Sequence, residues 1–580
     1  MPCNTKQERK LLSKIPNFII PPPLICQEKN NKFLQIYVFF VQKLAIEDLL
    51  KLCYNKLMNE RFLPIGIQDF EDLRTRGCIY VDKTDLIYKL ATEGKPYFLS
   101  RPRRFGKSLL LSTMEAYFLG KKELFKGLAI ETLEKEWIEY PVLKISFGAD
   151  NYPDLESLKS ALNLQLSDYE KLYDIKVEDR RFAPRFTNII KGIVNQTGKK
   201  LVILIDEYDK PILDALYTEF EEQNRQELRS FYSPLKDSDK YIRFLFITGI
   251  TKVSHVNIFS GLNQLNDISL NQDFSTICGV SETELENYFL PEIQALAEKQ
   301  GLSVEETKNK LAEMYDGYHF AYESEGIYNP FCLLKCFYEK MFGSYWFESG
   351  TPSFLVKTLQ NQPLELEHLI NGRIATENQF KNYDPDSKNM LAVVYQSGYL
   401  TIKGFEKETR FYTLDFPNRE VEEGFLDVLL QKFVSVPYDD VGLEINNLRI
   451  ALKNCNIDKV LSIIKAAIAD LPTVVKKNMC ENYYESVTHL MFRMTGMRVV
   501  SELQSVAGRS DVVVATKDSV FIFELKMDKG RPFEEVADEA LKQIDTNGYC
   551  ERFAVSGKKM YKIGVVFSSD GMGMVGWKVK

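Results

Sequence analysis

The stretch Tyr97-Phe-Leu-Ser-Arg-Pro-Arg-Arg-Phe-Gly-Lys-Ser108 decides the fold of this chain. An apolar strand over Tyr97–Leu99 runs into a Gly-Lys-Ser turn, and an apolar helix over Leu109–Leu119 follows. Backbone N–H groups and a helix N-terminus in such a turn face phosphate groups, so the stretch predicts a phosphate-binding P-loop. The candidate nucleotide-binding residues of this loop are Arg104, Phe105, Gly106, Lys107 and Ser108, with Lys107 on the outer phosphates and the Ser108 hydroxyl on Mg²⁺.

The loop departs from the usual P-loop pattern at one position. The pattern places glycine five residues before Gly106, where the backbone turns most tightly, and this chain has Arg101 there. An arginine costs backbone freedom at a tight turn, although Arg101, Arg103 and Arg104 can supply positive charge to phosphates. A solvated basic loop and a contact with nucleic acid are the other interpretations of these arginines. The sequence therefore predicts nucleotide binding and leaves nucleotide hydrolysis open.

Short apolar strands alternate with longer helical stretches from Phe62 to about Asn266. This order predicts an α/β domain with a mainly parallel sheet. The expected strands are Tyr97–Leu99, Val142–Phe147, Leu201–Ile205 and Phe244–Ile247.

Two carboxylates end the most apolar of these strands, in Leu201-Val-Ile-Leu-Ile-Asp206-Glu207. A continuous apolar run is typical of a strand that is buried on both faces. The run has the form of a Walker B motif, in which Asp206 holds Mg²⁺ through its water shell and Glu207 orients the attacking water. A simple helix cap is the structural alternative. Thr248, at the end of the next strand, is the candidate phosphate sensor.

A second group of polar residues lies near the C-terminus. The runs Gly508-Arg-Ser-Asp511-Val-Val-Val-Ala515 and Val520-Phe-Ile-Phe-Glu524-Leu-Lys526 predict the two strands of a hairpin. Strand alternation places Glu524 and Lys526 on one face, and pairing can bring Asp511 beside them. Asp511 and Glu524 are then candidate Mg²⁺ ligands, and Lys526 positions or activates the water that attacks a phosphodiester. An ordinary amphipathic hairpin with exposed charges is the alternative.

Helices are expected on both sides of this hairpin. One begins near Glu481 and precedes it, and one that contains Gln543 follows it. The resulting α-β-β-β-α order is that of PD-(D/E)XK nucleases, and the three residues form their D-x(n)-E-x-K arrangement.

Four motifs resemble those of the bacterial AAA-ATPase-like family that carries a C-terminal PD-(D/E)XK nuclease-like domain. The resemblance covers nearly everything after Met58, and that family also has the arginine-containing loop. It implies for the P-loop and Walker B residues the roles given above. It also implies that Glu481 is the helical acidic residue and Gln543 the polar residue of the nuclease site, with Glu485 and Glu502 as fallback acids. The motifs are Tyr80-Val-Asp-Lys-Thr84, Arg101-Pro-Arg-Arg-Phe-Gly-Lys-Ser108, Ile205-Asp-Glu-Tyr-Asp-Lys-Pro211 and Tyr315-Asp-Gly-Tyr-His-Phe320.

The expected organisation has five parts. Residues 1–57 form an irregular extension, with Met58 as the alternative start of translation. Residues 58–266 form the AAA-ATPase-like P-loop domain, and residues 267–403 form a helical lid in which His319 is a packed structural histidine. Residues 404–475 form a helical connector, and residues 476–580 form the PD-(D/E)XK nuclease-like domain, an α/β fold of the restriction-endonuclease type.

Composition narrows the classes of partner and site. The 580 residues carry a formal net charge of -7, so nucleic-acid contacts must come from local patches. Ten scattered cysteines and four histidines argue for free thiols in a reducing cytoplasm and against a zinc site. No targeting or transmembrane segment is evident, so we expect a cytoplasmic protein without a membrane partner.

These features predict an ATP-binding, Mg²⁺-dependent protein whose P-loop module regulates a fused nuclease. The expected partner is nucleic acid, with DNA favoured, and the setting is mobile-element maintenance or defence. A homo-oligomer is compatible with this function. The alternative is a nucleotide-dependent interaction switch with a non-cleaving nuclease-like domain. The intact acids favour the enzyme, and Arg101 favours the switch.

Overall fold

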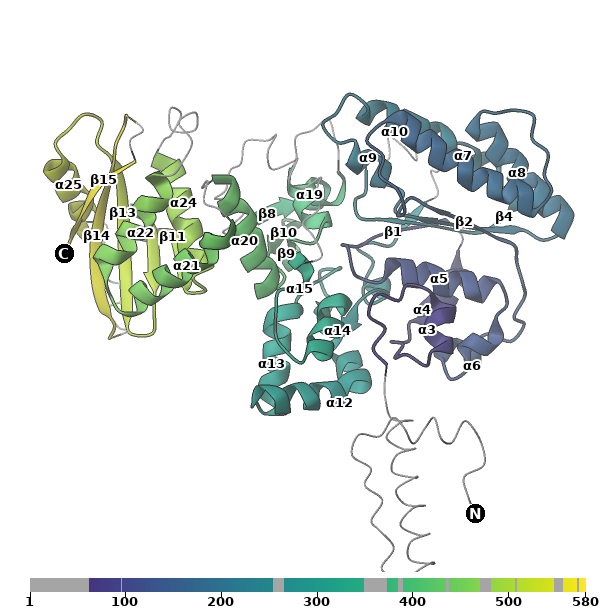
Figure 1. Cartoon of the computed structure of the whole chain (residues 1–580), viewed down its shortest axis with the longest axis horizontal. Helices are drawn as coiled ribbons and strands as arrows, with labels where there is room; N and C mark the ends of the chain where they lie inside the picture. The colour runs from purple at the N-terminus through teal and green to yellow at the C-terminus, as the bar shows by residue number, and fades with distance from the viewer. Residues whose placement is uncertain are drawn as a thin grey trace, which may run out of the picture. The chain divides into compact units, whose positions relative to one another are not determined.

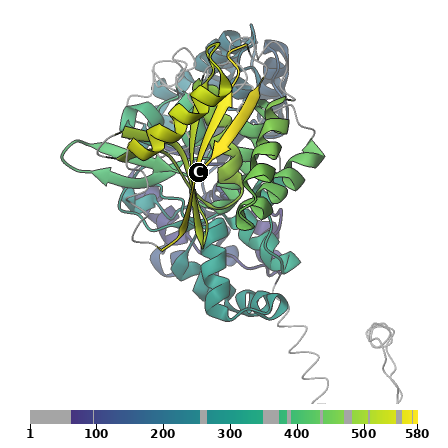
Figure 2. The same ribbon diagram turned by 90° about the vertical axis from the view of Figure 1, so that its left-hand side faces the viewer.

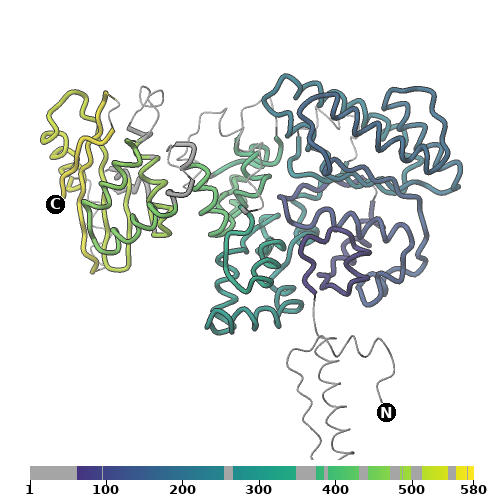
Figure 3. Tube along the Cα trace, viewed as in Figure 1, coloured from purple at the N-terminus to yellow at the C-terminus, as the bar shows by residue number. Residues whose placement is uncertain are grey.

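The computed structural model describes residues 62–94, 96–253, 265–348, 373–383, 390–433, 438–469, 481–505, 508–546, 557–570 and 573–580. The extension 1–57 and the alternative start at Met58 lie outside these residues. Leu63–Lys580 form one compact unit, and the Cα trace follows it from the P-loop domain through a middle region to the C-terminal domain (Figure 3). In the described ranges, no helix has the length and apolar character needed to span a bilayer.

A five-stranded parallel sheet forms the core of the P-loop domain. Its strand order is β2-β3-β4-β1-β5, so β4 lies between the strand that leads into the P-loop and the strand that ends in Asp206. All six residues of β3 are buried, as its continuous apolar run predicts. The four predicted strands are confirmed. The bounds are β1 Pro96–Ser100, β2 Val142–Ser146, β3 Leu201–Asp206, β4 Ile242–Gly249 and β5 Asn266–Asp267.

Helices cover both faces of this sheet (Figure 1). One face carries α3 Phe70–Thr75, α4 Thr84–Glu93, α5 Lys107–Phe118 and α6 Ala129–Leu133. The other carries α7 Leu155–Leu172, α8 Phe182–Thr197, α9 Lys210–Asp214 and α10 Glu221–Tyr232, which α11 Pro234–Asp237 follows. Because the strands are parallel, the residues after β1, β3 and β4 meet at one edge of the sheet.

The first part of the middle region is mainly helical, as predicted. Two helices begin with a capping box, in which Ser281 or Ser303 is followed three residues later by a glutamate. A two-stranded antiparallel pair, β6 and β7, joins the set. The bounds are β6 Val280–Ser281, α12 Glu282–Gln300, α13 Val304–Tyr315, β7 Ile327–Tyr328, α14 Pro330–Glu339 and α15 Tyr345–Glu348.

The boundary predicted at residue 403 needs correction, because it falls inside a strand. A three-stranded antiparallel sheet, order β8-β10-β9, occupies the start of the expected helical connector. In β10, Tyr412 and Leu414 are buried between more exposed neighbours, so the period is that of a strand. The bounds are β8 Arg373–Thr376, α18 Glu377–Lys381, α19 Met390–Gln396, β9 Thr401–Glu406, β10 Phe411–Asp415, α20 Arg419–Phe433, α21 Tyr438–Lys453 and α22 Ile457–Ala469.

The C-terminal domain has a five-stranded mixed sheet, order β11-β12-β13-β14-β15. The predicted hairpin is confirmed as the antiparallel pair β12–β13, and the α-β-β-β-α order is confirmed from α24 to α25. In Figure 2, α25 lies on one side of the sheet and α24 on the other. The bounds are α24 Glu481–Met494, β11 Arg498–Ser505, β12 Gly508–Ala515, β13 Ser519–Met527, α25 Phe533–Thr546, β14 Lys559–Phe567 and β15 Met574–Val579.

Candidate functional site

The P-loop turns without a glycine at its first position. The left-handed conformations fall on Arg104, with φ 69°, and on Gly106, with φ 89°, whereas Arg101 is not among the described residues with positive φ. The Arg101 N–H donates to the Gly249 carbonyl at 3.2 Å and thereby extends the pairing of β1 with β4. The expectation that Arg101 strains a tight turn is therefore wrong, because the chain is still extended at that residue.

The Arg101 side chain does not reach the space in front of the P-loop. It is 1% exposed, and its guanidinium donates to the carbonyls of Ser100, Ser269 and Phe274 at 2.9, 2.8 and 3.1 Å. Burial lowers the pKa of Arg101 to about 10, which leaves it charged at neutral pH. The expectation that Arg101 supplies charge to phosphates is corrected by this geometry.

The candidate phosphate residues line one cavity of about 460 Å³. Lys107, the first residue of α5, is 7% exposed, and its Nζ donates to the carbonyls of Arg101 and Pro102, both at 2.9 Å. Burial lowers the pKa of Lys107, while the nearby carboxylate of Asp206 opposes that shift. Arg104, Phe105, Gly106 and Ser108 line the same cavity.

The Walker B carboxylates lie beside the P-loop, although the two motifs are about a hundred residues apart in the sequence. The Ser108 hydroxyl donates to Oδ2 of Asp206 at 2.7 Å. Oδ1 of Asp206 is buried and has no hydrogen-bond partner among the described residues. A hydroxyl oxygen and a carboxylate oxygen so placed are hard ligands that fit Mg²⁺.

Glu207 follows directly and lines the cavity. Its φ of 52° is unusual for a residue with a side chain, and such conformations concentrate at functional sites. Burial raises the pKa of Glu207, and the charge of Lys107 opposes this. A carboxylate with a raised pKa is better matched to accept a proton from water near neutral pH.

Thr248 is not brought to this cavity. It is fully buried, and its hydroxyl donates to the Leu99 carbonyl at 2.8 Å, between β4 and β1. The sensor role given to Thr248 thus has no support from its position, because the hydroxyl joins two strands.

Sequence reasoning missed two further features of the cavity. Lys83 and Lys210 line it and are ion-paired with Glu284 and Asp214, at 2.5 Å each. Lys83 lies in the motif Tyr80–Thr84 and Lys210 in the motif Ile205–Pro211, but neither lysine was assigned a role from the sequence. The cavity also has an apolar wall, which includes Pro64, Ile67, Ile79, Val81, Phe331 and Leu334.

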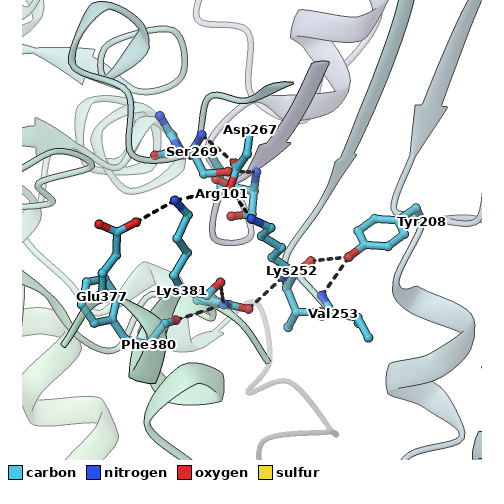
Figure 4. Close-up of polar contacts among 12 residues, drawn as sticks. Arg101, Tyr208, Lys252, Val253, Asp267, Ser269, Glu377, Phe380 and Lys381 are labelled. Carbon is cyan, nitrogen blue, oxygen red and sulfur yellow. Dashed lines mark hydrogen bonds and ion pairs between the residues drawn. The ribbon is translucent and has the colours of Figure 1, made fainter. Parts of the chain in front are cut away.

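The remaining Walker B motif residues hold the strand ends together. The Asp209 carboxylate, 1% exposed, accepts hydrogen bonds from the backbone N–H groups of Ile250 and Thr251 and from the Thr251 hydroxyl. The Tyr208 hydroxyl donates to the Thr251 carbonyl at 3.0 Å and accepts from the Val253 N–H at 3.0 Å (Figure 4). These contacts fix the segment after β4 against the segment after β3.

A buried ion pair near Arg101 joins the segment after β4 to β5 (Figure 4). The Lys252 Nζ is 2.6 Å from Oδ2 of Asp267, and the two side chains are 8% and 10% exposed. Lys381, itself paired with Glu377 at 2.7 Å, lies 3.9 Å from the same carboxylate oxygen. Burial acts to raise the pKa of Asp267, but Lys252 and Ser269 outweigh it and lower the pKa below its ordinary value.

We expect Asp267→Asn to lower the free energy of unfolding by about 3 kcal/mol, because it leaves Lys252 buried without its carboxylate. Chemical denaturation followed by circular dichroism measures this change. The matched control is Glu323→Gln, which breaks the exposed Lys407–Glu323 pair and is expected to cost under about 1 kcal/mol. Equal losses in the two variants would contradict the importance of the Asp267 pair.

The same pair has a defined pH dependence. Because the folded pKa of Asp267 is lowered, its contribution to stability is fully present above the unfolded carboxyl pKa of about 4 and is lost as pH falls through the folded pKa. The stability difference between the wild type and Asp267→Asn is therefore expected to shrink below about pH 4. Denaturation curves at neutral and acidic pH measure it, and a difference that grows on acidification contradicts the assignment.

The second candidate site lies in the C-terminal sheet, where register aligns three acidic positions. The β11–β12 pairs Ser501↔Val512 and Leu503↔Ser510 bracket Glu502 and Asp511 as opposite positions. The β12–β13 pair Val512↔Phe523, continued by one residue, puts Asp511 opposite Glu524. Glu502, Asp511 and Glu524 thus occupy one row across three strands. Glu502, which the sequence offered only as a fallback acid, is therefore aligned with the two predicted metal ligands.

Glu524 and Lys526 are close together, as strand alternation predicts. Glu524 is fully buried, and its Oε1 is 3.2 Å from the Lys526 Nζ. Both share a face of β13 with Ile522, which packs with Leu541 and Ile544 of α25. Lys526 also contributes, after Arg531, to the lowered pKa of Glu539 on α25.

Helix α25 lies close to this row. Gly564 of β14 pairs with Glu524, and a Cβ on Gly564 would stand 2.9 Å from the Ala537 carbonyl and 3.0 Å from the Ala540 Cβ. The helix therefore needs glycine there to approach the sheet. Gln543, one turn beyond Ala540, is half-buried on the same helix.

Glu481 begins α24, which packs on the opposite face of the sheet, where Phe492 contacts Phe523 at 4.7 Å between ring centroids. Glu485 lies one turn further along α24 and is half-buried. The side chains of Glu481, Glu502 and Asp511 lie outside the described part of the chain, so their roles stay predictions. Among the described side chains, no group of three or more His, Cys, Asp or Glu is placed to hold a metal ion.

His319 behaves as the expected structural histidine. Its Nδ1 is 2.8 Å from the Ser324 carbonyl, and its backbone N–H donates to the Thr401 hydroxyl at 2.7 Å.

Comparison with known proteins identifies the family of the P-loop domain and that of the C-terminal domain. A family model described as "Predicted AAA-ATPase" matches residues 64–259. A model of the PD-(D/E)XK nuclease superfamily matches residues 479–577. An "Uncharacterized protein in vnfD 5'region" of Azotobacter chroococcum mcd 1 is 34% identical over 535 residues, which cover 90% of this chain and 99% of that protein.

Proposed function

The chain belongs to the family that joins an AAA-ATPase-like domain to a C-terminal PD-(D/E)XK nuclease superfamily domain, and from that membership we propose that it is a metal-dependent nuclease under nucleotide control. The observation that carries the proposal is the buried Glu524 carboxylate, 3.2 Å from Lys526 and in register with Asp511. In an ordinary amphipathic hairpin the charged side chains would be exposed, and the carboxylate would not be buried beside a lysine.

The nucleotide half of the proposal rests on the P-loop cavity. Its charged lining consists of Lys83, Arg103, Arg104, Lys107, Lys210 and a single carboxylate, Glu207. Lys83 and Lys210 are balanced by Glu284 and Asp214. The other three cations still outnumber Glu207, which suits phosphates, and the apolar wall suits a base rather than a lone phosphate ion. Ser108 and Asp206 would hold Mg²⁺, and ATP is the ligand that this combination favours. Glu207 then accepts a proton from water if the nucleotide is hydrolysed.

The nuclease half assigns roles to the C-terminal residues. Asp511 and Glu524 would hold Mg²⁺, which supplies charge stabilisation at the phosphodiester. Lys526 orients the attacking water and keeps positive charge beside the cleaved bond. Gln543 supplies a neutral hydrogen-bonding group from α25. Glu481, whose helix packs on the opposite face of the sheet, keeps only the role of helical acid that the family resemblance implies. Nucleic acid, with DNA favoured, is the proposed substrate.

The interaction-switch alternative loses the feature that favoured it. It rested on Arg101 as a defect of the P-loop, and Arg101 instead forms three hydrogen bonds to carbonyls inside the protein. The buried Glu524 beside Lys526 supports the enzyme, so we retain it as the proposal.

The test incubates the full chain with Mg²⁺ or Mn²⁺ and end-labelled single- and double-stranded DNA and RNA, with ATP, a non-hydrolysable analogue or no nucleotide. We expect cleavage that stops when the metal is chelated and whose rate depends on the nucleotide. Binding of nucleic acid without cleavage in every nucleotide state would instead favour the interaction switch.

A further inference from the structure

The P-loop is held from outside by aromatic side chains of the middle region. Phe105, next to the Gly106 cap of α5 at the end of the loop, is 1% exposed. Its ring centroid lies 4.7 Å from that of Tyr318 and 5.3 Å from that of Phe320, both edge-to-face. The Arg101 guanidinium lies over the same Phe320 ring, 4.0 Å from its centroid. Both ends of the loop therefore contact the Tyr318–Phe320 segment.

Glycine at position 398 allows the middle region to come this close to the loop. Gly398 has φ +92°, and a Cβ there would stand 2.7 Å from the Pro102 Cβ. Gly279 has φ +94° and is needed inside the middle region, where a Cβ would stand 2.3 Å from Cγ2 of Ile327; it lies within ordinary contact distance of Phe105. The segments around residues 279, 318–320 and 398 enclose the loop, so its shape depends on contacts more than 170 residues away in the sequence.

The same motif contacts the segments that lead toward the C-terminal domain. The His319 N–H donates to the Thr401 hydroxyl at the start of β9, and that hydroxyl donates back to the His319 carbonyl at 3.2 Å. Asn418, just before α20, donates to the Asp316 carbonyl at 2.8 Å. Lys403 donates to the carbonyls of Gly317 and Pro417 at 3.2 and 2.9 Å.

Helix α20 in turn meets the first helix of the nuclease-like domain. Arg493 of α24 donates to the Glu422 carboxylate of α20, and the two side chains are 19% and 30% exposed. The contacts thus run without a break from the P-loop through Asp316–Phe320 to α20 and α24.

We propose that Asp316–Phe320 is the positioning element of the P-loop and the link that reports nucleotide occupancy to β9 and α20. The usual loop takes its shape from its first glycine. Here the rings of Tyr318 and Phe320 hold the loop in place through Phe105, and Arg101 holds it through its contact with Phe320. Through their backbone groups, Asp316, Gly317 and His319 contact Thr401, Lys403 and Asn418, which precede the nuclease-like domain. This inference rests on the nucleotide site proposed above and adds the route of its control.

The hydrogen bonds of Lys107 explain why occupancy acts on this element. The Nζ that serves the phosphates donates to the carbonyls of Arg101 and Pro102. A phosphate that recruits this Nζ competes with those two carbonyls. The residues released or shifted are the ones that contact Phe320 and Gly398, so the change enters the element directly.

The first test measures the affinity of the full chain for a fluorescent ATP analogue. Phe320→Leu removes the ring under Arg101 and beside Phe105, and we expect it to weaken binding about tenfold. Phe320→Tyr keeps the ring and is expected to bind like the wild type. Phe186→Leu is the control, because Phe186 is fully buried and stacked on Phe231 at 4.8 Å, away from the loop. Equal affinities in Phe320→Leu and Phe186→Leu overturn the positioning role.

The second test measures hydrogen exchange of residues 401–422 at saturating analogue, which removes the difference in affinity. We expect the nucleotide to change exchange there in the wild type and in Phe186→Leu, and to leave it unchanged in Phe320→Leu. The same nucleotide effect in Phe320→Leu as in the wild type overturns the link.

The two proposals fail in distinguishable ways. A wild type that binds the analogue no better than Lys107→Ala contradicts the nucleotide site itself. A wild type that binds it well, with Phe320→Leu equal to the wild type in both tests, contradicts this inference alone.

Discussion

Replacing Glu524 with glutamine is expected to lower the rate of metal-dependent nucleic-acid cleavage about a thousandfold, because a loss of ~4 kcal/mol in stabilising the transition state removes three powers of ten. Glutamine keeps the shape of the side chain but removes the charge that would hold the metal. The position is fully buried, and Lys526 lies 3.2 Å away. Gel assays of end-labelled substrate with Mg²⁺ or Mn²⁺ measure the rate.

The control for this variant is Glu534→Gln. Glu534 lies in the same domain on α25 and forms an exposed pair with Lys578 at 3.2 Å. We expect its cleavage rate to stay near that of the wild type. Metal binding gives a readout apart from activity, since a metal at a hundred times its dissociation constant stabilises the folded state by about 2.7 kcal/mol. Glu524→Gln should lose this thermal shift, and cleavage that survives the substitution would remove Glu524 from the metal site.

Replacing Lys107 with alanine is expected to weaken nucleotide binding at least about a hundredfold, since charge-assisted contacts to two phosphates contribute ~3 kcal/mol. The side chain is nearly buried and directed along the P-loop, where Nζ donates only to backbone carbonyls in the described structure. Titration with a fluorescent ATP analogue measures the affinity. Release of phosphate from ATP by the same preparations shows whether hydrolysis follows binding.

Lys144→Ala is the matched control for the P-loop lysine. Lys144 lies in β2 of the same domain and pairs with Glu115 of α5 at 2.8 Å, outside the cavity. Its removal is expected to leave the affinity unchanged. An affinity unaffected by Lys107→Ala places the nucleotide elsewhere, and the Walker interpretation of Ser108 and Asp206 fails with it.

Much of the fold was predictable because its signals are local. Continuous apolar runs marked β1 to β4, and the mainly helical character of the segment that holds α12 and α13 was also predicted. The hairpin β12–β13 followed from two alternating runs and a short polar turn. The sheet β8-β10-β9 was missed because residues 404–475 were assigned as a whole to a helical connector, although the burial of β10 alternates as in a strand.

The candidate sites were predictable wherever chemistry demands particular residues at a fixed spacing. Gly-Lys-Ser and the Asp206-Glu207 pair carry their own signal, and so do Glu524 and Lys526 two residues apart on one strand. The alignment of Glu502 with Asp511 was not predicted, because register depends on the pairing between strands. No local sequence pattern distinguishes Lys83 and Lys210, which line the cavity, from lysines on the protein surface.

The sequence by itself determined the two domain families of this protein and their candidate residues, because strand periodicity and motif spacing depend on neighbours within a few residues. Only the tertiary structure decided how each motif is used. It buried Thr248 between β4 and β1, and it turned Arg101 away from the cavity to stack on Phe320. It also joined Phe105 to a motif more than 200 residues later. Such contacts depend on which surfaces pack together, and packing is set by the shape of the whole unit rather than by any one stretch of the chain.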